Sequence, residues 1–118
     1  MDFDFERFSR IAASVYNEGN PYSLEEVLGV FSAYFQRYEQ HTGHPHPPIR
    51  ASQIARIVQD MPWIDAAGKE NFAADIDPDC YPIIIKQHFK TKYQRCDYNI
   101  NHFFSGRVRE LRYYETSY

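Results

Sequence analysis

The sequence predicts a mainly α-helical domain that ends in a small C-terminal β-hairpin, an α+β fold class. Apolar residues recur every three or four positions in several stretches, and glycine and proline separate those stretches, as expected for helices. The pair Ser105-Gly106 stands between two runs rich in aromatic and β-branched residues, and X-Gly is a preferred pair in two-residue hairpin turns. A chain of 118 residues suits one domain, so we expect residues 1–118 to form a single unit.

An N-terminal pair of helices is expected in residues 1–42. Apolar residues at helical spacing from Phe3 to Tyr16 predict the first helix. Ser23 and Glu26 have the spacing of a capping box, which predicts the start of the second helix, and Gly43 follows its expected end. The apolar stripe expected on this second helix consists of Leu24, Leu28, Phe31, Phe35 and Tyr38.

Two further helices are expected in the second half of the chain, at Ile49–Met61 and Asp79–Gln94. Residues 62–78 have no clear apolar period and are expected to form an acidic loop. Proline is tolerated in the first turn of a helix, so Pro82 agrees with a start near Asp79. The last of these helices is expected to turn Tyr81, Ile85, His88, Phe89 and Tyr93 to the core and Lys86, Lys90 and Gln94 to the solvent.

The predicted hairpin would pair residues on both sides of Ser105-Gly106. Its expected cross-strand pairs are Phe104 with Arg107, His102 with Arg109, Ile100 with Leu111 and Tyr98 with Tyr113. A helix is the alternative for the second half of this segment, because Val108, Leu111 and Tyr114 or Glu115 also fit helical spacing.

Positive charge is concentrated near the C-terminus, although the whole chain has a net charge of -3. Residues 86–112 contain seven Lys and Arg against two acidic residues, which leaves five net positive charges. Such an asymmetry indicates an electrostatic partner. Residues 60–79 are acidic, so pairing within the molecule is an alternative use of the same charges.

The order of elements over residues 49–115 resembles a winged helix, in which a helix-turn-helix pair is followed by a two-stranded wing. The resemblance implies that Ile49–Met61 is the supporting helix and Asp79–Gln94 the recognition helix, with Arg107 and Arg109 as contacts from the wing. The link between the two helices is longer and more acidic than the tight turn of that family.

This resemblance implies a small DNA-binding protein, such as a regulator or an accessory protein of a mobile element. Lys and Arg neutralise phosphates, while Gln, Lys and Arg can read base edges, so double-stranded DNA is the expected ligand. The candidate nucleic-acid-binding residues are Lys86, Lys90, Lys92, Gln94, Arg107 and Arg109. The alternative is a protein-interaction domain that binds a protein partner or a second copy of itself and has no catalytic activity.

A weak candidate metal site consists of His41, His44 and His46, because neutral imidazole is a common ligand of zinc, copper and nickel. No acidic residue or cysteine lies in this run. The ordinary interpretation is a helix end, where a histidine favours the helix dipole and Gly43 stops the helix. We therefore expect no metal and no other cofactor.

The sequence does not indicate an enzyme. It contains no glycine-rich phosphate loop, nucleophile elbow or HExxH motif. Cys80 or Cys96 could act with His88 or His102 as nucleophile and base only if the fold brought them together. Two cysteines without a metal-binding spacing indicate free thiols in a reducing compartment. With no signal peptide and no long apolar run, this predicts a cytoplasmic protein that does not cross a membrane.

Overall fold

The computed structural model describes residues 3–20, 22–59, 61, 78–93, 97–105 and 108–116. Within these ranges the regular elements are helices. They are α1 (Phe5–Val15), α2 (Leu24–Thr42), α3 (Ala51–Gln59), the 3-10 helix η1 (Pro78–Cys80), α5 (Tyr81–Lys90), α6 (Ile100–Phe103) and α7 (Val108–Thr116).

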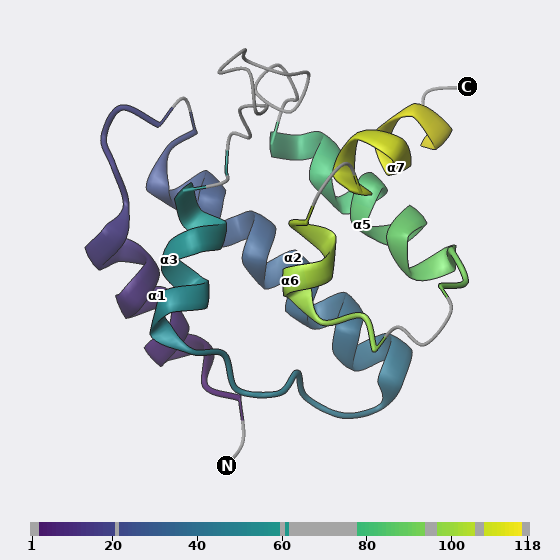
Figure 1. Ribbon diagram of the computed structural model, residues 1–118, viewed down its shortest axis with the longest axis horizontal. Coiled ribbons are helices and arrows are strands. Elements are labelled where there is room, and N and C mark those ends of the chain that lie inside the picture. The colour runs from purple at the N-terminus through teal and green to yellow at the C-terminus, as the bar shows by residue number, and fades with distance from the viewer. Residues whose placement is uncertain are drawn as a thin grey trace.

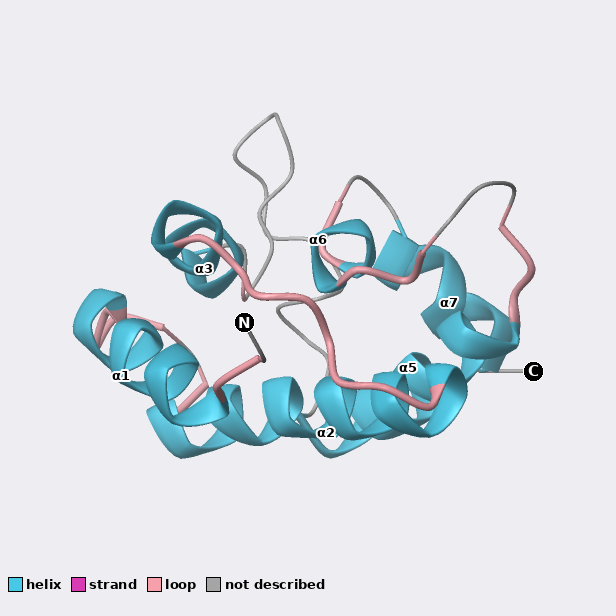
Figure 2. Ribbon diagram, turned by 90° about the horizontal axis from the view of Figure 1, so that it is seen from below, coloured by secondary structure: helices cyan, strands magenta, loops and turns pink. Residues whose placement is uncertain are grey.

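The long helix α2 runs through the middle of the molecule. In Figure 1, α1 and α3 lie on one side of it and α5 and α7 on the other. Figure 2 shows that α1, α2 and α5 form one layer, while α3 and α6 lie above them and α7 crosses over α5. The main helix pairings are α1 with α3, α2 with α5, and α5 with α7. Helix α5 is therefore enclosed by α2 on one side and α7 on another.

The predicted caps of α2 are confirmed. The Ser23 hydroxyl accepts a hydrogen bond from the Glu26 N–H at 3.1 Å, and the Glu26 carboxylate accepts one from the Ser23 N–H at 2.9 Å. At the other end Gly43 has a φ of 82°, and its N–H donates to the Glu39 carbonyl at 2.8 Å. These local signals fix both ends of the helix because they satisfy backbone groups that have no partner inside it.

The core face of α2 differs in part from the predicted stripe. Leu24 and Leu28 are half-buried rather than buried. The buried residues of α2 are Val27, Val30, Phe31, Tyr34, Phe35 and Tyr38. The Tyr34 hydroxyl donates to the Tyr98 carbonyl at 2.6 Å, so this central tyrosine also holds the segment that precedes α6. The stripe is wider than predicted because α1 and α5 both cover this helix.

The predicted C-terminal β-hairpin is wrong. In the described residues this part of the chain forms α6 and α7, and no described residue belongs to a strand. The Asn99 side chain accepts a hydrogen bond from the Asn101 N–H at 3.0 Å and so starts α6. Ile100, Phe103 and Phe104 are all buried, and that spacing suits one face of a helix rather than a strand. The wing of the winged-helix interpretation is therefore absent from the described residues.

Helix α5 follows the prediction at its start and in its two faces. Pro78–Cys80 forms a 3-10 turn, and Pro82 then lies in the first turn of α5. Tyr81, Ile85 and His88 are buried, while Lys86 is exposed. The helix ends at Lys90, earlier than predicted, with Thr91 as its C-cap.

None of the described helices combines the length and the apolar character needed to cross a lipid bilayer. This finding agrees with the expectation from the sequence for the part of the chain that the structure describes.

Candidate functional site

Three of the predicted nucleic-acid contacts lie on the surface. Lys86 and Lys90 are exposed on α5, one helical turn apart, and Lys92 is exposed just after the helix. Gln94 and Arg107 lie outside the residues that the structure describes. The surface therefore retains the helix part of the predicted basic face.

Arg109 was predicted as a contact from the wing, and this prediction is wrong. Its side chain is buried, with 2% of its surface exposed. The guanidinium carbon lies 4.8 Å from the centre of the Phe104 ring, and the side chain donates to the Tyr81 hydroxyl at 3.5 Å. A strand would have turned Arg109 outward near the hairpin tip, whereas α7 turns it toward α5.

A hollow of about 260 Å³ lies between α2 and α5. We call it the basic hollow; its lining residues are Arg37, Gln40, His41, Lys86, Phe89 and Lys90. Three of the six carry a fixed positive charge and none is acidic. Sequence reasoning missed the contribution of α2, because Arg37 stands in an N-terminal half in which acidic residues predominate.

The ring of His41 is held at the edge of the basic hollow by two aromatic neighbours. Its centroid lies 5.3 Å from that of Phe89 and 4.9 Å from that of Tyr98. Phe89 is itself nearly buried, so it forms the floor of the hollow, while His41 is exposed. The hollow thus joins fixed cations to an exposed flat ring.

The three histidines of the candidate metal site do not form a ligand set. His46 is buried, and its Nε2 atom lies 3.0 Å from the Ile100 N–H, while its Nδ1 atom lies 2.7 Å from the Pro47 carbonyl. A backbone N–H can only donate, so Nε2 accepts and Nδ1 carries the proton. Burial also lowers the pKa of His46.

His41 and His44 are exposed, and no group of three metal-ligating side chains occurs among the described residues. The buried member of the run, His46, instead packs the segment between α2 and α3, and both of its ring nitrogens are hydrogen-bonded.

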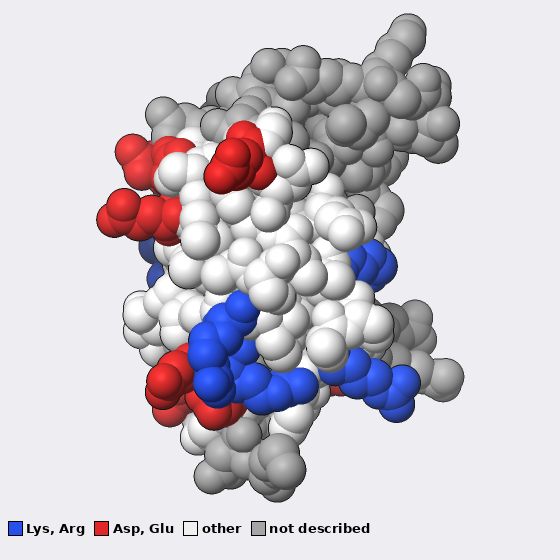
Figure 3. All heavy atoms as spheres, turned by 90° about the vertical axis from the view of Figure 1, so that its left-hand side faces the viewer, with Lys and Arg blue, Asp and Glu red and all other residues white. Residues whose placement is uncertain are grey.

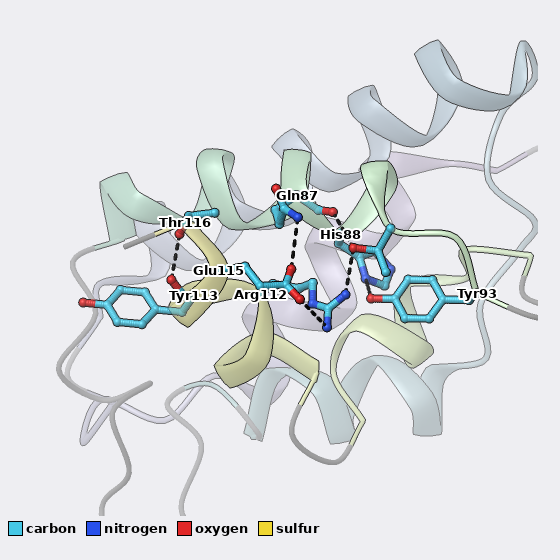
Figure 4. Close-up of polar contacts among 8 residues, drawn as sticks. Gln87, His88, Tyr93, Arg112, Tyr113, Glu115 and Thr116 are labelled. Atoms are coloured by element: carbon cyan, nitrogen blue, oxygen red, sulfur yellow. Dashed lines mark hydrogen bonds and ion pairs between the residues drawn. The ribbon is translucent and has the colours of Figure 1, made fainter. Parts of the chain in front are cut away.

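A second group of polar residues lies between α5 and α7 (Figure 4). His88 is fully buried, and its Nδ1 atom lies 3.0 Å from the Tyr93 hydroxyl. The ring of His102 lies 5.3 Å from that of His88. Burial is the main cause that lowers the pKa of His88 to about 3, and the nearby His102 and Arg112 contribute to the same shift. His88 is therefore neutral at physiological pH.

Arg112 connects this group to the rest of α5 (Figure 4). It donates to the Thr91 hydroxyl at 2.7 Å and forms an ion pair with Glu115 at 3.1 Å. Glu115 in turn accepts a hydrogen bond from Gln87 at 3.0 Å. These contacts dock α7 on α5, so the group has a structural role in holding the two helices together.

The thiol arrangement considered from the sequence is not completed by the described residues. Cys96 lies outside them, and Cys80 is half-buried beside the start of α5. His88 makes its hydrogen bond to Tyr93, and His102 packs edge-on against the same ring at 4.6 Å. The described residues therefore do not place a thiol and an imidazole together as nucleophile and base.

The opposite side of the molecule carries charges of both signs. Figure 3 shows the side on which α1 and α3 lie, where blue and red atoms occur close together among white ones. At the start of α1 the Asp4 side chain accepts a hydrogen bond from the Arg7 N–H at 3.1 Å, and the Arg7 guanidinium donates to the Ile49 carbonyl at 3.1 Å. Charges of both signs occur on this side, whereas the residues that line the basic hollow include no acidic one.

Comparison of the chain with models of protein families, with curated proteins and with solved structures finds no match.

Proposed function

We propose that this protein binds DNA and that the basic hollow contacts the phosphates of the DNA backbone. The observation that carries the proposal is the convergence of Arg37, Lys86 and Lys90 on one hollow whose lining contains no acidic residue. Lys and Arg side chains that neutralise phosphates release condensed counterions, which is the main source of sequence-independent affinity.

Lys86 and Lys90 remain DNA contacts in this proposal, as predicted from the sequence. The second set of contacts comes from α2 in place of the predicted wing. Arg109 is excluded, because a buried side chain cannot reach a phosphate. Arg37 brings a planar guanidinium that can donate two parallel hydrogen bonds to one phosphate. Gln40 adds an uncharged donor at the same hollow.

The test is a fluorescence anisotropy titration with labelled DNA of about 20 nucleotides in mixed sequence, at about 50 mM and about 200 mM salt. We expect binding at the lower salt and a loss of about tenfold or more in affinity for the double variant K86Q/K90Q. Circular dichroism checks that the variant is folded.

Lys92→Gln is the matched control, because Lys92 is exposed and basic but does not line the hollow. It should change affinity by less than about threefold. The proposal is wrong if the wild-type protein binds neither single-stranded nor duplex DNA at low salt. It is also wrong if K92Q weakens binding as much as K86Q does alone.

A second candidate function is a protein-interaction domain, and the exposure of two large apolar side chains favours it. Ile83 is 59% exposed on α5 and Leu111 is 45% exposed on α7. If a second copy of this chain covers them, sedimentation will show a concentration-dependent dimer that I83S and L111S weaken. Under the DNA-binding proposal, I83S leaves the affinity for DNA within about twofold of the wild type.

The expected location is the cytoplasm, where free thiols stay reduced.

A further inference from the structure

We infer that the ligand of the basic hollow is a single strand, whose backbone follows the seam between α2 and α5 and one of whose bases stacks on His41. The inference rests on the proposed function and specifies its substrate class. It follows from three features of the surface: the packing of α5, the arrangement of the lining side chains in two rows, and the exposed ring at the edge of the hollow.

The packing of α5 prevents it from acting as a recognition helix. A helix with its side chains is about 10–12 Å wide, which is close to the width of about 12 Å of the DNA major groove. Helix α5 does not protrude, because α2 packs beside it in the same layer and α7 crosses it (Figure 2). Two helices packed side by side are roughly 20 Å wide, too wide for the groove.

Four of the lining side chains lie in two rows across a seam, and three of them, Arg37, Lys86 and Lys90, carry a fixed positive charge. Arg37 and His41 are four residues apart on α2, so they lie on one face of that helix, one turn from each other. Lys86 and Lys90 have the same spacing on α5, and all four side chains line the same hollow. This arrangement can contact a backbone from both sides. A flexible single strand can lie between the rows and contact both of them. A duplex is rigid and can bring only one of its two backbones to the hollow.

The exposed ring of His41 offers a surface for a base. Single-stranded nucleic acid is commonly held by a basic groove together with flat side chains on which bases stack, and histidine is one of these side chains. Phe89 and Tyr98 pack against the His41 ring, so it need not be ordered when a base arrives. Phe89 itself is 6% exposed and serves as the floor rather than as a stacking surface.

The first arm of the test compares a labelled single strand of about 20 nucleotides with the same strand annealed to its complement, in otherwise identical anisotropy titrations. We expect the single strand to bind about tenfold more tightly or better. For three fixed cations the slope of log affinity against log salt should be about -2 on the single strand, and R37Q should reduce its size by about 0.7.

The second arm tests the base platform with two variants of one exposed position. His41→Ala removes the ring and should weaken single-strand binding by about tenfold. His41→Tyr keeps a flat ring and should remain within about threefold of the wild type. Duplex binding should not distinguish the two variants.

The outcomes separate this inference from the proposed function. If neither ligand binds, the proposed function fails and this inference fails with it. If the duplex binds as well as the single strand, and K86Q/K90Q still weakens it, the DNA-binding function stands and the single-strand inference is overturned. If H41A and H41Y behave alike on the single strand, the base platform is overturned.

Discussion

At the residue scale, the most unusual group of the molecule is the buried imidazole of His88. Its burial lowers its pKa from the ordinary value of 6.5 to about 3. The unfolded chain therefore binds a proton below about pH 6.5 that the folded protein does not bind. The free energy of unfolding must then fall as the pH falls from about 6.5 toward 3, by up to about 1.4 kcal/mol per pH unit.

The variant His88→Gln should remove the part of this pH dependence that comes from His88. Urea unfolding at several pH values between about 7.5 and 4.5 should show a smaller loss of stability per pH unit for H88Q than for the wild type. The difference should correspond to the uptake of about one proton fewer on unfolding. His44 is exposed and is the control, so H44Q should keep the wild-type dependence. Equal slopes for H88Q and the wild type would show that His88 is protonated in the folded protein.

Arg109 gives a second prediction at this scale, because its role is packing rather than binding. Arg109→Ala should lower the free energy of unfolding by about 2–4 kcal/mol, since it removes a buried side chain that lies over Phe104 and contacts Tyr81. Chemical denaturation measures this, with K92A as an exposed control that should stay within about 0.5 kcal/mol of the wild type. A change as small as that of K92A would contradict the packing role.

At the element scale, one glycine inside α2 and one at its C-cap should respond in opposite ways to the same substitution. Gly43 caps the helix with a φ of 82°, so G43A should destabilise the protein by about 1 kcal/mol, although no atom obstructs the new β-carbon. Gly29 lies exposed inside the helix, also with open space around it, so G29A should stabilise by about 0.5–1 kcal/mol. Thermal and urea unfolding of G43A and G29A measure these changes. A change in the free energy of unfolding of the same sign in both variants would contradict the prediction.

The elements that the sequence predicts correctly are those with local signals. The capping box of α2, Gly43 after it and the proline in the first turn of α5 all act within a few residues. The hairpin failed because its turn signal is also local but weaker than the tertiary packing of Ile100, Phe103 and Phe104. The apolar residues at helical spacing in α7 do not mark its inward face, because Leu111 is exposed while Arg109 and Arg112 are buried.

The candidate site was also predictable only where its residues are close together in the sequence. Lys86 and Lys90 were found because the two faces of α5 are separated in its own sequence. Arg37 and His41 were not found, because only the packing of α2 beside α5 brings them to the same hollow. Charge counted along the chain places Arg37 with acidic neighbours, whereas charge mapped on the surface places it with lysines.

At the scale of the whole molecule, α7 is held differently from the helices that pack on α2. The core residues between α1, α2 and α3 are apolar or aromatic, such as Phe8, Phe31 and Ile54. By contrast, α7 is docked on α5 through the hydrogen bonds from Arg112 to Thr91 and from Gln87 to Glu115, while the ion pair between Arg112 and Glu115 lies within α7. Burial of apolar surface is non-directional and large, whereas each of these polar contacts contributes about 0.5–1.5 kcal/mol.

Stability should therefore be distributed unevenly, with α7 opening at a lower free energy than α2. Native-state hydrogen exchange should show that the amides of α7 exchange through a partial opening, while those in the middle of α2 exchange only through global unfolding. Arg112→Gln should lower the opening free energy of α7 by about 1–2 kcal/mol, because it removes the charged hydrogen bond to Thr91 and the contact with the Tyr93 ring. The protection of α2 relative to global unfolding should not change. Equal exchange free energies in α2 and α7 would show instead that the polar contacts of Arg112 join α7 to one cooperative unit. The basic hollow would then depend on α7 for its stability, because α5 supports both.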